Sequence, residues 1–312
     1  MNESVSLRVI DFEEESGMKI TMWAIAVIVT MIVIFGPVHA APVITVDGDL
    51  SDWGLTQLQT GDWSKEATWL PADGVRYIIE DNYDPKLGAS SYTGVHITGS
   101  GSSYVPYSEP LRPLRSDPTE LVKEPYGGEL SDVDAFYFTQ DADKFYVAVI
   151  TSAPPDGAGD LRGGDLAIKI GPGGMFGYDW GVKLSSLPPF SQGAIIKDPV
   201  WEGKGYLLPA GPDMIIGGTD TGKTAPIVYN SNWLINKPEI AFGTPYTKYV
   251  IELAVNKADL GVTGPIDITQ LKLEQNCHND SIYLPEFPTI AISFGLIGAL
   301  GLVIYSMQSK KD

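Results

Sequence analysis

Two adjacent segments, residues 133–139 (VDAFYFT) and 144–151 (KFYVAVIT), decide the fold of this chain. Both are rich in aromatic and β-branched residues and alternate between two faces, which is typical of β-strands. The short polar link 140–143 (QDAD) predicts that they form a β-hairpin. Alternation groups the large side chains into two sets on opposite faces. The first set is Phe136, Phe138, Phe145, Val147 and Val149, and the second is Tyr137, Tyr146 and Ala148.

Similar short runs predict further strands, separated by turn residues. The chain contains 34 glycines and 23 prolines, a composition that disfavours long helices. Residues 256–261 predict one helical turn that ends at Gly261, and the proline-rich residues 103–129 predict an irregular insertion. Further strands are predicted at 43–46, 75–80, 92–98, 165–170, 178–184, 193–197, 249–255 and 266–274. We therefore expect an all-β fold with a single β-sandwich domain.

The N-terminal residues predict export. Lys19 precedes an apolar stretch at residues 22–35, and the Val-His-Ala sequence ending at Ala40 matches a signal-peptide cleavage site. We expect cleavage between Ala40 and Ala41. The start of the chain is acidic where a signal peptide is basic, so Met18 is a second candidate for the first residue. An uncleaved N-terminal anchor stays open as an alternative.

The C-terminal residues predict a membrane helix. An apolar run of about 18 residues, 290–307, would form a helix roughly 27 Å long, close to the hydrocarbon thickness of a bilayer. Lys310 and Lys311 follow the run and favour a cytoplasmic end. The body of the protein is therefore expected outside the cell.

A tetrad, Pro285-Glu286-Phe287-Pro288, stands directly before this run. The order of tetrad, apolar helix and basic tail resembles the PEF-CTERM sorting signal of archaeal surface proteins. The resemblance implies recognition by an archaeosortase-like enzyme, removal of the helix and transfer of the new C-terminus to a membrane lipid. A plain C-terminal membrane anchor stays open as the alternative.

These signals predict three parts: a leader and signal peptide at residues 1–40, an extracellular β-sandwich at 41–284, and a sorting signal with its transmembrane helix at 285–312.

The chain has 39 acidic and 21 basic residues and a net charge of −18. Nucleic-acid partners are excluded, because phosphate contacts need clustered lysine and arginine. The single cysteine, Cys277, excludes an intrachain disulfide.

Two segments of the predicted body carry a second resemblance. Residues 46–53 (VDGDLSDW) are similar to the opening of family 9 carbohydrate-binding modules and related DOMON-like sandwiches. Residues 141–149 (DADKFYVAV) resemble the central strand pair of the same families. The resemblance implies a β-sandwich in which the opening segment places a buried tryptophan at one edge.

Candidate ligand residues follow from side-chain chemistry. Trp63 and Trp69 lie in a polar stretch and are candidates for the flat platforms that hold sugar rings. Asp47, Asp49 and Asp52 gather hard oxygen ligands in one turn, as Ca²⁺ requires. Asx-turns that need no metal are the default interpretation of such a turn.

Two further motifs occur in the chain. Residues 217–224 match the Walker A pattern, but an extended segment follows where a nucleotide-binding loop needs a helix, so we expect a glycine-rich loop. Asn279 begins an Asn-x-Ser sequon and is a candidate glycosylation site in an exported chain.

We expect no catalytic residues, since the chain lacks a Gly-x-Ser-x-Gly elbow and a His-Glu-x-x-His motif. The sequence favours an anchored, non-catalytic surface protein that binds polysaccharide or other envelope proteins, or that serves as envelope structure. One alternative is a secreted carbohydrate-active enzyme with paired carboxylates. Another is a DOMON-like haem or redox protein with Met175, Met214 or His96 as an axial ligand.

Overall fold

The structure is a computed structural model, and its described residues are 42–57, 69–84, 89–106, 133–154, 156–157, 163–170, 177–202, 212–233, 240–241, 244–245, 247–262, 270–274 and 281–285. The chain divides into two compact units, Ala40–Glu286 and the pair of terminal segments Met1–His39 and Phe287–Asp312. Every described residue belongs to the first unit. Its regular structure is β-strand with short 3₁₀ turns and, within these ranges, no α-helix, which confirms the all-β prediction.

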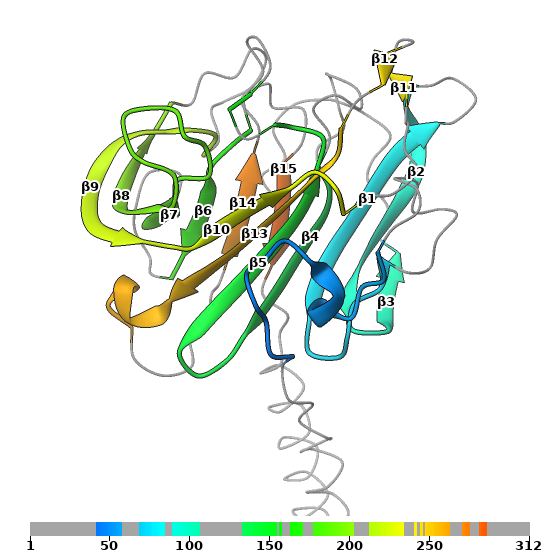
Figure 1. Cartoon of the computed structure of the whole chain (residues 1–312), viewed down its shortest axis with the longest axis horizontal. Coiled ribbons are helices and arrows are strands. Elements are labelled where there is room, and N and C mark those ends of the chain that lie inside the picture. The colour runs from blue at the N-terminus through cyan, green and yellow to red at the C-terminus, as the bar shows by residue number, and fades with distance from the viewer. Residues whose placement is uncertain are drawn as a thin grey trace, which may run out of the picture. The chain divides into compact units, whose positions relative to one another are not determined.

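A seven-stranded antiparallel sheet forms the first layer (Figure 1). The predicted hairpin lies in its middle and is confirmed. Both of its strands also pair outward, with β1 on one side and β13 on the other. In spatial order the strands are β10 (Ile227–Asn230), β13 (Tyr249–Asn256), β5 (Lys144–Thr151), β4 (Val133–Gln140), β1 (Arg76–Asp84), β2 (Ala89–Ser100) and β3 (Ser103–Pro106).

A six-stranded antiparallel sheet forms the second layer. Its strands come mostly from the middle and the end of the body, and β15 and β9 form its two edges. In spatial order they are β15 (Ser281–Pro285), β14 (Gln270–Glu274), β6 (Leu166–Lys169), β7 (Trp180–Val182), β8 (Ala194–Trp201) and β9 (Ile215–Thr224). A separate two-stranded ribbon joins β11 (Ile240–Ala241) to β12 (Thr244–Pro245).

The inner core lies between the two sheets. Phe136, Phe138 and Val147 of the large sheet share one buried cluster with Ile168 and Leu271 of the small sheet. All five side chains are at most 2% exposed. The face predicted for the first set of hairpin residues is therefore confirmed, and it packs as in a sandwich of two sheets.

The outer face of the large sheet is buried as well. Tyr137, Ala148 and Ile150 belong to a second cluster, which includes Trp53 and Trp69 from the N-terminal part of the body. The second set of hairpin residues thus lies on the opposite face, as predicted. The pattern did not predict that this face would be covered by another part of the chain.

The first expected strand, residues 43–46, is not a strand in the structure. The backbone N–H of Thr45 donates to the Asp52 carboxylate at 2.6 Å, and Ile44 and Val46 pack on the outer cluster. Side chains therefore hold this extended segment where a neighbouring strand would otherwise do so. The short helix η1 (Leu50–Trp53) follows it and ends at Gly54, whose φ of 81° needs a residue without a Cβ.

Two other predictions change in detail, and a third is confirmed. Residues 217–224 are not a loop but most of edge strand β9, which pairs with β8 through several register shifts. Residues 103–106 form β3, so the proline-rich insertion begins with a paired strand, and residues 107–132 lie outside the described ranges. The predicted helical turn is confirmed as η6 (Lys257–Leu260), with Gly261 as its C-cap.

Candidate functional site

The acidic turn at residues 47–53 is held by its own carboxylates. Asp47 accepts the backbone N–H of Asp49 at 2.8 Å, and Asp49 accepts the N–H of Ser51 at 2.9 Å as the N-cap of η1. Asp52 accepts the N–H of Thr45. These are Asx-type turns and a helix cap, in which carboxylate oxygens satisfy local backbone donors.

A buried glutamate on β13 ties this turn to the large sheet. Oε2 of Glu252 accepts the backbone N–H groups of Asp47 and Gly48 at 2.9 and 2.8 Å. Oε1 accepts the indole N–H of Trp53 at 2.7 Å. Glu252 has no exposed surface. One carboxylate therefore joins two separate parts of the N-terminal segment to a central strand.

The backbone at Gly48 shows how closely the segment approaches the sheet. Its φ is 81°, and an added Cβ would lie 2.8 Å from Cβ of Asn230 on β10. The Asn230 side-chain amide donates to the Gly48 carbonyl at 2.8 Å. Glycine is required here both for the left-handed conformation and for the contact.

Burial sets the electrostatics of this site. Burial raises the pKa of Glu252, the three donated hydrogen bonds oppose that rise, and repulsion from Asp52 adds to it. Burial also raises the pKa of Asp52, against the Thr45 N–H, and the charges of Asp47 and Asp49 raise it further. The site thus holds carboxylates that favour protons more than free ones do.

The calcium hypothesis for Asp47, Asp49 and Asp52 is not supported by this geometry. Within the described ranges, no three acidic, histidine or cysteine side chains are arranged to hold a metal ion. The carboxylates are aimed at N–H donors of their own turn. The arrangement therefore favours Asx-turns without metal.

The expected sugar platform is wrong for Trp69. Its side chain has no exposed surface and packs in the outer cluster, where its carbonyl oxygen accepts the Tyr137 hydroxyl at 3.0 Å. A polar sequence context misled the prediction, because the covering partners of Trp69 are distant in sequence. Trp63 lies outside the described residues.

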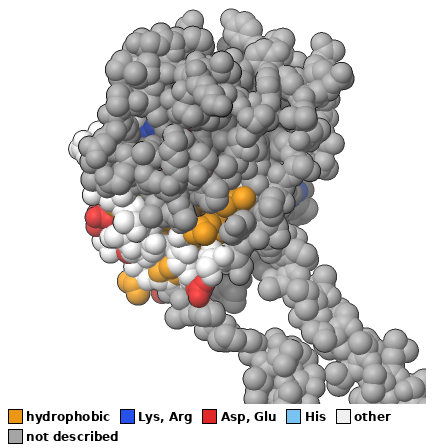
Figure 2. Space-filling view, turned by 90° about the vertical axis from the view of Figure 1, so that its right-hand side faces the viewer, with side chains coloured by type: hydrophobic (Ala, Val, Ile, Leu, Met, Phe, Trp, Pro, Cys, Tyr) orange, Lys and Arg blue, Asp and Glu red, His pale blue; other side chains and the backbone are white. Residues whose placement is uncertain are grey.

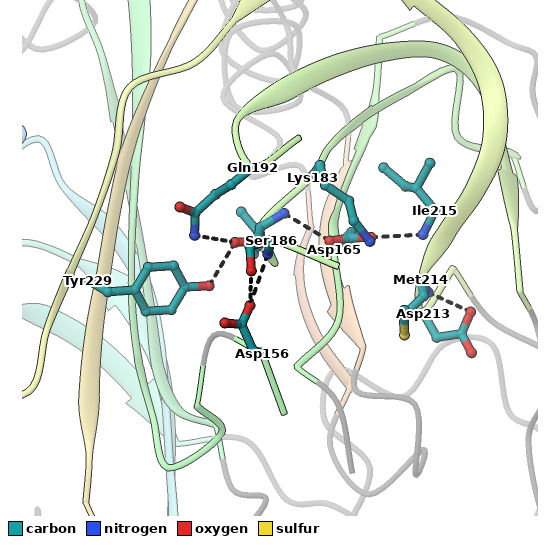
Figure 3. A network of polar contacts seen from close by, with 10 residues as sticks. Asp156, Asp165, Lys183, Ser186, Gln192, Asp213, Met214, Ile215 and Tyr229 are labelled. Atoms are coloured by element: carbon teal, nitrogen blue, oxygen red, sulfur yellow. Dashed lines mark hydrogen bonds and ion pairs between the residues drawn. The ribbon is translucent and has the colours of Figure 1, made fainter. Parts of the chain in front are cut away.

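A second set of polar groups gathers at the small sheet (Figure 3). Asp165 and Lys183 form an ion pair at 2.9 Å, and neither side chain is exposed. Asp165 also accepts the backbone N–H groups of Leu184 and Ile215, each at 2.8 Å. Burial raises the pKa of Asp165, and Lys183 with the two N–H groups opposes the rise.

The same network reaches the large sheet through the Leu184 carbonyl. That oxygen accepts the Gln192 amide at 2.8 Å and the Tyr229 hydroxyl of β10 at 3.2 Å (Figure 3). Ser186 donates through its backbone N–H and its hydroxyl to one oxygen of Asp156. This network fixes the loop after β7 between the two layers.

A small cavity lies beside Tyr229, bordered by Thr151, Ile251 and Leu273. Its volume of about 10 Å³ is room for roughly one water molecule. Its walls come from both sheets, so it is a packing gap of the inner core. It is too small for a sugar or a haem.

The processing residues lie at the limit of the described chain. Pro285 is the last residue of β15 and pairs with Gln270 of β14. Ala40, Ala41, Glu286, Phe287, Pro288 and Asn279 lie outside the described residues. No helix within the described part of the chain is long and apolar enough to span a bilayer, and both predicted terminal helices fall outside that part.

The haem candidates are scattered. Met214 is 2% exposed beside the Asp213 end of the polar network, and His96 lies on β2 in the other sheet. Met175 lies outside the described residues. The two described candidates lie on different sheets, because Met214 directly precedes β9 and His96 is on β2.

The sequence analysis missed Glu252, Asp165 and Lys183. Their signal was present, because each is a lone charge in or beside an otherwise apolar strand. Such a charge is rarely buried without a partner. The identity of the partner depends on the tertiary fold.

No family model, curated protein or solved structure matches this chain. The class of this protein is therefore given by its fold alone, which is all-β and built mainly from two antiparallel sheets.

Proposed function

We propose that this chain is an anchored cell-surface protein whose β-sandwich body binds an envelope ligand or serves as envelope structure, without catalysis. The observation that carries the proposal is the position of β15. This strand is paired up to Pro285, the first residue of the tetrad that precedes the apolar run. On this proposal, the last paired residue of the body is also the first residue of the sorting signal.

The chemistry of the buried carboxylates supports a structural body. Glu252 and Asp165 each accept hydrogen bonds from fixed donors in distant segments. A general acid or base must reach a substrate proton with the same atoms. Because the oxygens of these carboxylates already accept hydrogen bonds within the fold, their role is to join its parts.

Charge and surface chemistry narrow the ligand class. The net charge of −18 disfavours anionic polymers. The described surface in Figure 2 presents hydrophobic and acidic side chains and some basic ones. We propose a neutral polysaccharide of the envelope as the ligand, with Trp63 as the platform.

Intact mass spectrometry of the native protein from an envelope fraction tests the anchoring. The proposal expects an N-terminus at Ala41 and a C-terminus within residues 285–288 that carries a lipid. A C-terminus at Asp312 in the membrane fraction would reduce the sorting signal to a plain anchor. A soluble chain with both ends intact would overturn the proposal.

Sedimentation with purified envelope polysaccharide tests the ligand. Trp63→Ala should abolish co-sedimentation, and Trp63→Phe should retain most of it, because an aromatic face is kept. Equal binding by both variants would exclude Trp63 as the platform. No binding by the unaltered protein would leave the envelope-structural role.

A further inference from the structure

A second buried lysine–aspartate pair joins two segments of the large sheet. Asp134 is on β4, and Lys248 directly precedes β13. Strand β5 runs between them, so the lysine side chain reaches across a whole strand. Its Nζ contacts Oδ1 of Asp134, and neither side chain has any exposed surface.

The chain around this pair is buried. Ala135, next to Asp134, and Val250, two residues after Lys248, are at most 1% exposed. The phenol of Tyr137 interacts electrostatically with Asp134. Two opposite charges removed from water in such a place are costly, and the loss of both charges relieves that cost.

We propose that Lys248 and Asp134 form an intramolecular isopeptide bond. A proton passes from the lysine ammonium to the aspartate carboxylate along their contact, which gives a neutral amine and a neutral carboxylic acid. The amine lone pair then forms a bond to Cγ. The carboxyl C–O bond breaks, its oxygen takes two protons, and one water molecule leaves.

The geometry supplies what this condensation needs. In water the two groups are charged, hydrated and rarely in contact. Held together in a water-poor core, they react at an effective concentration far above any in solution. The product amide carries no charge, so burying it costs less free energy than burying the ion pair.

The first lysine–aspartate pair, Asp165 and Lys183, serves as an internal reference. Asp165 accepts two backbone N–H groups as well as Lys183. Those donors stabilise its anionic form, and a carboxylate anion is a poor target for an amine. We therefore expect Asp165 and Lys183 to remain an ion pair.

The cross-link would act on the whole sandwich. It joins residues 114 positions apart in sequence and fixes β13 to β4 across β5. A bond that closes so long a loop restricts the unfolded chain. This inference goes beyond the proposed function and does not depend on anchoring or ligand binding.

A tryptic digest of the denatured full-length protein tests the proposal. The cross-link blocks cleavage after Lys248 and joins residues 124–144 to residues 224–257, with a mass one water below the sum of the two peptides. Cleavage after Lys183 should proceed and serves as the internal control. An unlinked 124–144 peptide together with cleavage after Lys248 would overturn the proposal.

The variant Lys248→Arg locates the bond. It should abolish the linked pair and release residues 124–144 at full mass. A linked 124–144 peptide that persists in this variant would place the bond elsewhere and overturn the assignment. The digest of the unaltered protein decides the question even if the variant does not fold.

Discussion

The two faces of the large sheet are built by the same strands but held by different forces. The inner face presents Phe136, Phe138 and Val147 to a second sheet, and its cluster is wholly apolar. The outer face presents Tyr137 to Trp53 and Trp69. There the Trp53 indole N–H and the Tyr137 hydroxyl are hydrogen-bonded, and Glu252 accepts the first of these bonds.

This difference teaches where stability should respond to mutation and where it should respond to pH. The stabilisation from apolar side chains between the sheets is lost when a mutation removes side-chain volume. Glu252 is the hub of the outer face, because it accepts hydrogen bonds from the covering segment. Its stabilising contribution is lost when the carboxylate is removed or its protonation changes. The following predictions test the two faces against each other.

The largest effect is expected on the inner face. Phe136→Ala removes a ring with no exposed surface from the middle of the sandwich. We expect a loss of about 3–5 kcal/mol in the free energy of unfolding, because a cavity remains between the sheets. Urea denaturation measures it. A loss below about 1 kcal/mol would mean that the two sheets close over the gap.

Removal of the charged hub comes next. Glu252→Ala leaves two buried donors and one part-buried donor without an acceptor, and should lower the free energy of unfolding by about 2–4 kcal/mol. Limited proteolysis should then cut residues 42–57 early. Asp49→Ala, which removes only the cap of η1, should cost about 1 kcal/mol. Equal costs for the two variants would contradict the role of Glu252 as the hub.

The pH dependence should differ between the hub and the hairpin tip. Because the pKa of Glu252 is raised, its stabilising contribution is present below its unfolded value near 4.5 and is lost as pH rises through the folded pKa. The stability difference between the unaltered protein and Glu252→Gln should therefore fall as pH rises above about 4.5. Denaturant midpoints over a pH series measure it.

Asp141 provides the control of opposite sign. Burial opposes the shift, but the N–H groups of Lys144 and Asp143 and the Tyr146 hydroxyl hold its pKa below the ordinary value of 3.8. Its contribution is present above pH 3.8 and is lost as pH falls through the folded pKa. The difference between the unaltered protein and Asp141→Asn should therefore shrink toward acid. If the two stability differences changed with pH in the same direction, the opposite pKa shifts of Glu252 and Asp141 would be refuted.

The smallest effect is expected for single hydroxyl groups. Tyr137→Phe removes the bond to the Trp69 carbonyl and should cost about 1 kcal/mol. Tyr229→Phe removes a longer bond, 3.2 Å, to the Leu184 carbonyl and should cost less. Thermal unfolding of both variants compares them. A larger loss for Tyr229→Phe would show that the bridge between the sheets is the stronger contact.

Local pattern predicted the strands of the hairpin and their faces, because alternation at residues 133–151 is a local property. It predicted η6 and its glycine stop for the same reason. It failed at residues 43–46, where a side chain, Asp52, accepts the Thr45 N–H and Ile44 packs on the outer cluster without a neighbouring strand. It also misjudged Trp69, because burial is decided by which segments cover it. The two lysine–aspartate pairs were out of reach, since they exist only once the sheets are assembled.

If the apolar run lies in a membrane, the end of β15 at Pro285 limits how far the body can lie from it. Only residues 286–289 separate the last paired residue from the apolar run. Even fully extended, that span measures about 18 Å from Pro285 to Ile290. In a chain anchored by that run, the β-sandwich would therefore stay close to the membrane, within a thin layer of the envelope. Its ligands would be those present within that layer.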